Sequence, residues 1–371
     1  MAYRGNSESA DCTLKTAPDF KFCEDAAFWD IYDGRDNLRD SQQLSRRHVV
    51  VSCDPNRKAW NTVLGPLRNP DPHGALWLLE HHASTMSRTG ELRVELKNYP
   101  PNYDFHPLGL AISPSYGNGT SNMFVVNHAR TRTVIEQFTL SSAFPGVATH
   151  IRTLSSPYFV SPNSVALTSP DSFFVTNDHF MTRRLPFYLG EILPILETLL
   201  GLPFSWVSHI SVDPDHTSPS PITEHEFSAL FIPFANGISI SPSGSQVAVA
   251  STSMSRVLIY SRDPASNALT HAHTVPVPFH PDNLEFDETG GVIVAGHPHF
   301  PSLLKVKADP TEVAVSPSWV VTITSTEVDT LFQSDGTGFS SSTTGLRDST
   351  GALYVTGLYT DGILVCGVSL S

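Results

Sequence analysis

The stretch FANGISISPSG (residues 234–244) combines a strand pattern with a break in that pattern. Isoleucine and serine alternate from Ile238 onward, which predicts a half-buried strand, and Pro-Ser-Gly then supplies turn residues. Asn236 and Gly237 stand at the start of this strand, although both residue types are depleted from strand interiors. Either the chain forms a bulge or tight bend here, or Asn236 presents its amide oxygen to a ligand while Gly237 lets the backbone come close.

Length and composition favour one large all-β domain. The 371 residues include 23 glycines and 29 prolines, which fall between short apolar runs, and only 16% of the residues are charged. The net charge of −13 argues against nucleic acids and anionic membranes as partners. The same acidity suits a protein that binds a cation, and it equally suits plain solubility.

Units of strand, turn and strand recur along the chain at intervals of about 60 residues, the scale of a propeller blade with loop insertions. Each unit begins with an irregular, polar or glycine-containing stretch, and the openings are Glu24, Leu108, Asn163, Asn236, Asn283 and a point near Ser341. Six such units predict a six-bladed β-propeller, whereas a two-sheet sandwich would not need six. We expect residues 12–371 to form this single domain and residues 1–11 to form an N-terminal tail.

One segment, LGEILPILETLLGLPF (189–204), predicts a helix, within an insertion at about residues 183–204. Its apolar residues recur at helical spacing: Leu189, Ile192, Leu193, Leu196, Leu199 and Leu200. Such a stripe usually packs against a core, and a lid or membrane-surface helix is the functional alternative. Two glutamates and two prolines argue against a membrane span.

The four cysteines show no C-x-x-C spacing, so a structural zinc site is not expected. Cys12 and Cys366 lie near the two ends of the chain, where a disulfide could close nearly the whole chain as one loop. Cys23 and Cys53 are expected to be buried and not paired with each other. The N-terminal residues contain no apolar signal-peptide region, while the sequon at residues 118–120 is compatible with a secreted protein.

Oxygen-bearing side chains gather at the openings of the repeated units. They are Glu24 and Asp25 in FCEDAAFW, Asn163 in SPNSVAL, Asn236 in FANGI, and Asp282 and Asn283 in HPDNLEF. Carboxylate and amide oxygens are hard donors, which suit Ca²⁺ better than zinc. Each residue alone also fits a turn former or strand cap. Because the inner strands of a propeller line one channel, their recurrence predicts a calcium site there with a position left for substrate.

These residues resemble the serum paraoxonase/arylesterase family, whose members are six-bladed propellers with a calcium ion in the central tunnel. The resemblance runs from about Cys12 to Cys366, and its most specific motifs are FANGISISPSG, VTNDHF (175–180), FVVNH (124–128), PDNLEFDETGG (281–291) and GHP (296–298). It implies a disulfide between Cys12 and Cys366. It also implies that the catalytic calcium is bound by Glu24, Asn163, Asn236, Asp282 and Asn283.

In that family, calcium polarises the carbonyl of a lactone or ester, and a histidine acts as general base for water. The family pairs a histidine in a P-H-G motif with a second histidine after V-V-N. His128 matches the second, but Leu108 stands in place of the first, and His106 lies two residues earlier. Ser164 replaces an aspartate ligand of the family's second, structural calcium, so we expect that ion to be bound weakly or not at all.

Two functions follow from these residues. The first is a calcium-dependent lactonase or arylesterase acting on a bulky hydrophobic carbonyl substrate, which Leu108, Phe234 and His128 would contact. His128, Asp178 and His297 are the catalytic candidates. Asp178 and His297 could act as substitute bases, and the alternative is that they are structural groups that support the ligands. The second is a non-hydrolytic cyclisation or cycloaddition, for example a hetero-Diels–Alder step on a natural-product intermediate. Leu108 favours the second function because it cannot take a proton from water, and it predicts weak hydrolysis of ordinary aryl esters and simple lactones. His128 would then donate a hydrogen bond.

Overall fold

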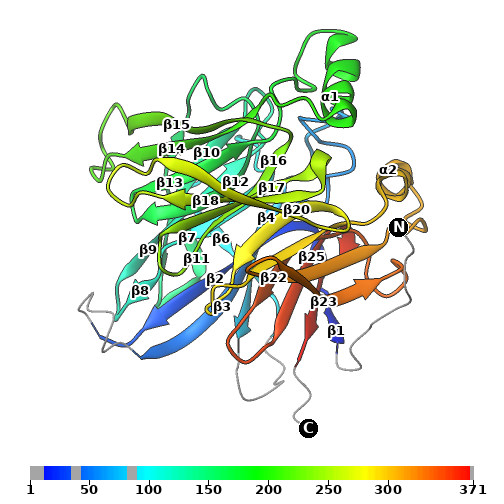
Figure 1. The fold of residues 1–371 in the computed structure, drawn as a ribbon. Coiled ribbons are helices and arrows are strands. Elements are labelled where there is room, and N and C mark those ends of the chain that lie inside the picture. Colours follow the sequence, from blue (N-terminus) through cyan, green and yellow to red (C-terminus); the bar gives the residue numbers. More distant parts are fainter. Residues whose placement is uncertain (1–11, 35–42, 82–89, 368–371) are drawn as a thin grey trace.

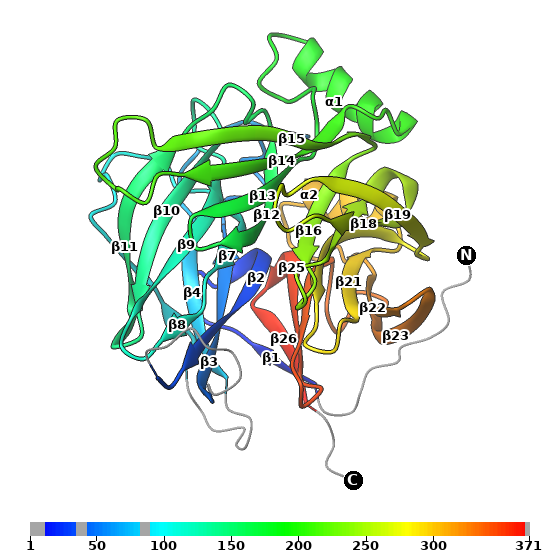
Figure 2. The same ribbon diagram turned by 60° about the vertical axis from the view of Figure 1, so that its left-hand side comes forward.

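The computed structural model describes residues 12–34, 43–81 and 90–367. The predicted N-terminal tail, residues 1–11, lies outside these ranges. The described chain is almost entirely β-sheet, and its sheets are arranged as in a β-propeller (Figures 1 and 2). The described residues contain two α-helices, α1 (Leu189–Leu200) and α2 (Phe300–Ala308), and a short 3₁₀ turn at Thr252–Met254.

Three sheets are four-stranded antiparallel meanders in chain order. Their strands are β12 (Pro162–Ser169), β13 (Ser172–Asn177), β14 (Ser205–Val212) and β15 (Ile222–Ile232); β16 (Ala235–Ile240), β17 (Gln246–Ser251), β18 (Arg256–Arg262) and β19 (Leu269–Pro276); and β20 (His280–Phe286), β21 (Val292–His297), β22 (Ser318–Thr324) and β23 (Glu327–Ser334). A fourth sheet has the order β6 (Glu95–Lys97), β11 (Phe144–Leu154), β10 (Val134–Ser141), β9 (Thr120–Asn127) and β7 (Pro107–Ile112).

The fifth sheet joins the beginning of the chain to its end. Its order is β1 (Cys12–Lys15), β26 (Ile363–Cys366), β25 (Leu353–Asp361), β2 (Lys21–Tyr32), β3 (Leu44–Cys53), β4 (Ala75–His81) and β5 (Leu92–Arg93), with β24 (Ser342–Arg347) paired to β25 and β8 (Ser115–Tyr116) paired to β2. Within this sheet β1 pairs antiparallel with β26, and the predicted disulfide between Cys12 and Cys366 is confirmed.

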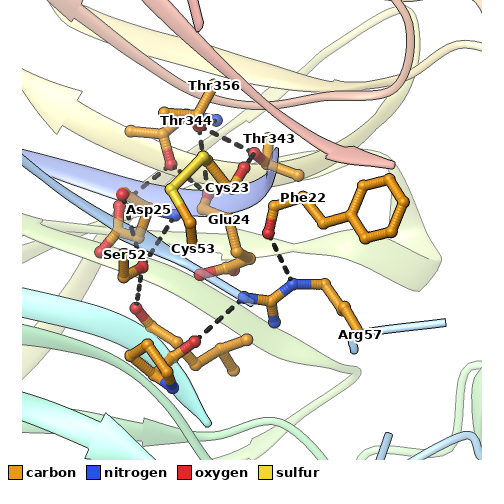
Figure 3. Close-up of a disulfide and its surroundings, with 12 residues drawn as sticks. Phe22, Cys23, Glu24, Asp25, Ser52, Cys53, Arg57, Thr343, Thr344 and Thr356 are labelled. Atoms are coloured by element: carbon orange, nitrogen blue, oxygen red, sulfur yellow. Dashed lines mark hydrogen bonds between the residues drawn. A yellow bond between two sulfur atoms is a disulfide. The ribbon is translucent and has the colours of Figure 1, made fainter. Parts of the chain in front are cut away.

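The expectation that Cys23 and Cys53 are not paired with each other is wrong. They are opposite each other in the antiparallel register of β2 and β3, and they form a second disulfide (Figure 3). Both cysteines are fully buried, as expected. The prediction failed because it was made from spacing along the chain, whereas the pair is created by the cross-strand register.

The strands nearest the centre form a closed ring. Strands β2, β7, β12, β16, β20 and β24 contact one another in this cyclic order, and β24 returns to β2. Each of them has a break in its pairing register, and the breaks lie at Cys23/Asp25, Pro107/Leu110, Pro162/Val165, Ala235/Ile238, Pro281/Leu284 and Ser342/Gly345. A β-bulge re-aims the side chains that it contains. The same local distortion therefore recurs at every polar opening predicted from the sequence.

The bulge in β16 resolves the question posed by Asn236 and Gly237. A side chain at position 237 would place its Cβ 2.5 Å from the Cα atom of Asn283 in the neighbouring strand β20, so this position needs glycine. Gly109 is similar, because a Cβ there would lie 2.2 Å from the carbonyl oxygen of Asn163. The bulge therefore lets the ring close tightly, and Asn236 remains free to serve a site.

The hydrophobic core is divided into layers between neighbouring sheets. One layer brings Trp29 of β2 together with Phe138 of β10, and another joins Val257 of β18 to Val294 of β21. Strand residues alternate between these layers, as expected for sheets that are covered on both faces. The inner strands that carry the predicted site residues are therefore supported by hydrophobic layers between the sheets.

Helix α1 confirms the predicted helix, but the expected core packing of its apolar stripe is wrong. Leu199 and Leu200 are 65% and 66% exposed, and Leu189, Ile192 and Leu196 are exposed as well. The buried positions are Gly190, Pro194 and Glu197. The Glu197 carboxylate accepts hydrogen bonds from the backbone N–H groups of residues 180 and 181 at 2.9 and 2.8 Å, so a polar face holds the helix.

Helix α2 was not predicted from the sequence. It begins with a proline in its first turn, and it buries Leu303 and Val306 against Tyr359. Neither described helix is long and apolar enough to cross a membrane.

Candidate active site

A cavity of about 130 Å³ opens at the end of the channel where the bulges lie. Four of the five predicted calcium ligands line it, namely Glu24, Asn163, Asn236 and Asp282. The fifth, Asn283, is buried beside Glu24 and donates a hydrogen bond from Nδ2 to Glu24 Oε1 at 2.9 Å. The structure thus brings together residues that are separated by as much as 259 positions in the sequence.

The amide groups of the three asparagines are held in one orientation. Asn236 Nδ2 donates to Asp282 Oδ1 at 2.7 Å and to Thr252 Oγ1 at 3.1 Å. Asn163 Nδ2 donates to Asp178 Oδ2 at 3.1 Å. In each asparagine the amide nitrogen is therefore bonded to protein, and the oxygen is turned away from these partners.

The oxygens of the same groups have no protein partner. Four buried atoms lack a hydrogen bond: Glu24 Oε2, Asn163 Oδ1, Asn236 Oδ1 and Asn283 Oδ1. A buried polar atom without a partner costs about 1–3 kcal/mol, so four together in one place need an explanation. All four are acceptors, and hard oxygen acceptors are what Ca²⁺ prefers. The donor set therefore fits this ion.

The buried carboxyl groups of the site are electrostatically suited to a cation. Burial raises the pKa of the Glu24 carboxyl well above its ordinary 4.5, and the neighbouring Asp25 and Asp282 carboxylates raise it further. Arg57 opposes this rise, and Figure 3 shows its guanidinium beside the Glu24 side chain. The described residues contain no cluster of three or more His, Cys, Asp or Glu side chains that could hold a metal, so the site depends on amide oxygens.

The polar side chains of Asp25 and Ser164 are both bonded to protein. Asp25 Oδ2 accepts from the backbone N–H of Leu110 at 2.9 Å, and Oδ1 accepts from Ala26 N–H and Thr344 Oγ1 at 2.9 and 3.0 Å. Ser164 Oγ accepts from the N–H of Ile238 at 3.3 Å. These groups complete the ring of inner strands instead of leaving oxygens free.

His128 lines the cavity, but the protein uses both of its ring nitrogens. Nε2 donates to the carbonyl oxygen of Pro162 at 2.9 Å, and Nδ1 accepts from Thr62 Oγ1 at 2.5 Å. Burial lowers the pKa of His128 to about 4, so its ring is neutral near pH 7. His128 therefore offers no free nitrogen to a substrate or a water molecule in this arrangement.

The two predicted substitute bases, Asp178 and His297, also line the cavity. Asp178 accepts from Asn163 and from His179 Nδ1, the latter at 3.2 Å. His297 donates from Nε2 to Asp282 Oδ2 at 2.9 Å, and its buried Nδ1 has no partner. Asp178 thus orients an asparagine, and His297 orients an aspartate.

The cavity wall includes Leu108 and Phe234, as predicted for substrate contacts, together with Leu303, Leu304 and Tyr359. The Phe234 ring packs 4.4 Å from the ring of His179, so its position is fixed by a neighbour outside the predicted ligand set. This wall is largely apolar. The polar part of the same cavity, here called the floor, is formed by Glu24, Asn163, Asn236 and Asp282.

Several charged residues of the cavity were not predicted from the sequence. Asp54 and Arg57 follow β3 in a loop, and Lys307 lies on α2. Arg57 donates from Nε to the Phe22 carbonyl and from Nη2 to the Pro107 carbonyl, both at 3.0 Å. The run SCDPNRKAW reads as an ordinary turn after a strand, so nothing in it separates these residues from other loop residues.

Comparisons with known proteins identify the relatives of this chain. A sequence model of the family Arylesterase matches residues 67–366. Curated relatives include serum paraoxonase/arylesterase 2 of Gallus gallus, 29% identical over 231 residues, with 62% of this chain and 59% of that protein covered. Serum paraoxonase/lactonase 3 of Oryctolagus cuniculus is 26% identical over 276 residues, with 74% and 72% covered.

The chain thus spans about three-fifths of the length of the Gallus gallus relative. Among solved structures, a luciferin-regenerating enzyme superposes with a TM-score of 0.51 over 96% of both chains at 12% identity, which supports the fold. The family match covers most of the chain, and it includes four of the five predicted ligands. The chain belongs to the arylesterase family.

Proposed function

We propose that the protein is a calcium-dependent hydrolase that cleaves an ester or lactone bond in a bulky hydrophobic substrate. The observation that carries this proposal is the group of four unpartnered, buried oxygens on Glu24, Asn163, Asn236 and Asn283. Family membership supports hydrolysis of an ester or lactone, and the lining of the cavity supports a hydrophobic substrate.

The frame of this enzyme is a single six-bladed propeller over residues 12–371, with an insertion at about residues 183–204. Four blades correspond to the four- and five-stranded sheets. The nine-stranded sheet supplies the other two, because it divides at the pairing of β2 with β25 into β2–β5 and the group β24, β25, β26 and β1. The ring of six bulged inner strands supports the same count.

The calcium ligands in this proposal are Glu24, Asn163, Asn236, Asp282 and Asn283. When bound, the ion supplies Lewis-acid polarisation of the substrate carbonyl. The protein's own contribution is to hold the ligand oxygens in place, through the bonds from the asparagine Nδ2 atoms and from His297 to Asp282. A second calcium is not part of the proposal, because Asp25 and Ser164 are bonded to the backbone.

The apolar wall of the cavity selects the substrate, and it excludes water from the side of the substrate that points away from the floor. Leu108, Phe234 and Leu303 offer no hydrogen bonds, so they favour a substrate whose one polar group reaches the floor. His128, with both nitrogens bonded to protein, fixes the strand entry at Pro162 next to a ligand.

A second function, a non-hydrolytic cyclisation or cycloaddition, is favoured by two observations. Leu108 replaces the family's base, and His128 has no free nitrogen. In that case the bound ion would polarise the carbonyl group of a reactive compound, and the channel would hold that compound in the conformation that cyclises.

We place the protein in the secretory pathway or outside the cell. Two disulfides are typical of oxidising compartments. The sequon asparagine, Asn118, is exposed in a turn before β9, where a glycan would not clash with the core.

The decisive experiment is a hydrolysis screen of aryl esters and lactones, including phenyl acetate and dihydrocoumarin, with metal content measured in parallel. Hydrolysis that is lost in EGTA and restored by calcium chloride is the expected result. A protein that binds calcium and hydrolyses none of these probes would refute the hydrolase and favour the cyclisation. A protein that binds no calcium would refute both.

A further inference from the structure

A buried histidine–aspartate pair stands beside the proposed calcium ligands and belongs to none of them. His106 Nδ1 and Asp54 Oδ2 are 2.8 Å apart, and the two side chains are each only 2% exposed. Both residues line the same cavity as Glu24 and Asp282. The other ring nitrogen of His106, Nε2, is buried and has no hydrogen-bond partner.

The surroundings fix the tautomer of this histidine. Asp54 Oδ1 accepts from the backbone N–H of Asn56 at 2.9 Å, which leaves Oδ2 for the imidazole. A carboxylate can only accept, so Nδ1 carries the proton and Nε2 keeps a free lone pair. The bond from the orienting group to one nitrogen thus prepares the other nitrogen to act as a base.

The ring is also fixed in position. Trp60 stacks on it at 5.5 Å between ring centroids, and the Trp60 Nε1 atom donates to the His128 carbonyl at 2.8 Å. The backbone of His106 accepts from His128 N–H at 3.1 Å and donates to Asn127 Oδ1 at 2.8 Å. A residue whose only role is to fill the core would not need a lone pair directed away from all of these contacts.

We propose that His106 is the general base of this enzyme and that Asp54 is its positioning residue. The inference rests on the proposed hydrolysis. His106 Nε2 takes a proton from water as the water oxygen forms a bond to the substrate carbonyl carbon, and the carbonyl electron pair moves onto its oxygen. The pair then returns, the bond to the leaving oxygen breaks, and His106 passes the proton to that oxygen. The base missing at Leu108 is thereby supplied two residues earlier.

Other charged and titratable groups surround His106. Asp54 faces Nδ1 of His106. The ring of His73 lies edge-on to the His106 ring, with 5.7 Å between the two ring centroids, and the Asp104 carboxylate interacts electrostatically with His106. Arg57 donates to the carbonyl of the next residue, and His128 is neutral near pH 7.

The test compares four proteins with calcium in excess: wild type, His106→Asn, Asp54→Asn and the control His271→Asn, which alters an exposed histidine of β19. We measure kcat and KM for phenyl acetate from about pH 5 to about pH 9, together with calcium content. His106→Asn should lower kcat by about 10²-fold or more, abolish the acidic limb of the kcat profile, and leave calcium content unchanged. Asp54→Asn should lower kcat less and shift that limb. The control should match wild type.

Nitrogen-15 NMR of histidine-labelled wild-type protein reads the tautomer of His106 directly, without a kinetic assay. The His106 resonances, assigned by their absence in His106→Asn or by their shift in Asp54→Asn, should show a protonated Nδ1 and an unprotonated Nε2 at neutral pH. The opposite tautomer would overturn the proposal.

A His106→Asn enzyme with kcat within about threefold of wild type and an unchanged pH profile would also overturn it. In that case hydrolysis that EGTA still abolishes would leave the proposed function standing. A wild-type protein without calcium-dependent hydrolysis would refute the proposed function, and the base role with it.

Discussion

Converting Asn236 to aspartate should destabilise the metal-free protein and should make the stabilisation by calcium larger than it is in wild type. In the structure Asn236 Nδ2 donates to Asp282 Oδ1 at 2.7 Å. Asn236→Asp replaces this donor with a second carboxylate oxygen of almost the same shape. Without a cation, two negative charges at this distance repel by about 6 kcal/mol at an effective dielectric constant of about 20. Uptake of a proton by the pair relieves part of that repulsion.

We therefore expect Asn236→Asp to lose about 2–4 kcal/mol of stability in EGTA at mildly alkaline pH. For a chain of 371 residues this lowers the unfolding midpoint by about 3–5 °C. Calcium at a thousand times its dissociation constant stabilises a folded protein by about 4 kcal/mol, or about 5 °C here. Because the ion neutralises the added charge, the rise in Asn236→Asp should exceed the rise in wild type.

The assay is thermal unfolding in EGTA, in excess calcium chloride and in excess magnesium chloride. The control is Asn122→Asp, since Asn122 Nδ2 donates to Asp171 Oδ1 at 3.0 Å at the surface, away from the channel. This variant should show a small loss that calcium does not specifically reverse. Equal midpoints of wild type and Asn236→Asp in EGTA, or equal calcium shifts in both, would refute the calcium site at Asn236.

Three further predictions concern other parts of the chain. The Cys23–Cys53 disulfide closes a loop of 30 residues, so replacing both cysteines with alanine should cost about 3–4 kcal/mol in urea unfolding, and a non-reducing peptide map should show the linked peptides. Burial lowers the pKa of Lys307 from its ordinary 10.5 to about 8, so the stability that this lysine contributes is present above about pH 10.5 and lost as pH falls through 8. Lys307→Met should therefore be about 1–2 kcal/mol more stable than wild type at pH 7. This is less than the roughly 3.4 kcal/mol that the full pKa shift would give, because the side chain is partly exposed. The difference in stability should disappear by about pH 10.5, and the exposed control Lys305→Met should show no gain. Leu108→His should change phenyl acetate hydrolysis by less than about threefold if the base is already present, and a gain of about 100-fold would show that it was missing.

The repeat could be predicted from the sequence because each inner strand carries the same distortion. Asn236 and Gly237 are poor strand formers. Gly237 is required there by the close approach of the Asn283 backbone, and the amide oxygen of Asn236 has no protein partner. The interpretation as a bulge is confirmed, and a bulge re-aims the side chains that it contains. The role of Asn236 as a ligand stays a prediction.

The packing of helix α1 shows what periodicity cannot determine. The leucine stripe and the set Gly190, Pro194 and Glu197 both follow helical spacing, so either face could have been buried. The structure buries the second set because Glu197 bonds two backbone N–H groups of the loop after β13. The N–H groups that Glu197 bonds belong to the loop, so the pattern of the helix sequence does not indicate which face is buried.

The pair of Asp54 and His106 was missed for a related reason, because the two residues are 52 positions apart. Asp54 directly follows β3 in one sheet, and His106 directly precedes the inner strand β7 of another sheet. Only the closing of the ring of inner strands brings these two chain segments together. His106 was noted in the sequence because it lies two residues before Leu108, yet no pattern indicated that a carboxylate would meet it.

The proposed role of His106 would explain how this chain keeps a general base although Leu108 replaces the family's histidine. Leu108 lies in the bulge of β7, whereas His106 stands just before that bulge, still at the rim of the cavity. Asp54 starts that loop directly after Cys53, which the disulfide ties to Cys23, the neighbour of Glu24. One covalent link thus fixes a proposed calcium ligand and the positioning residue relative to each other, so loss of the Cys23–Cys53 bond should impair kcat as well as stability.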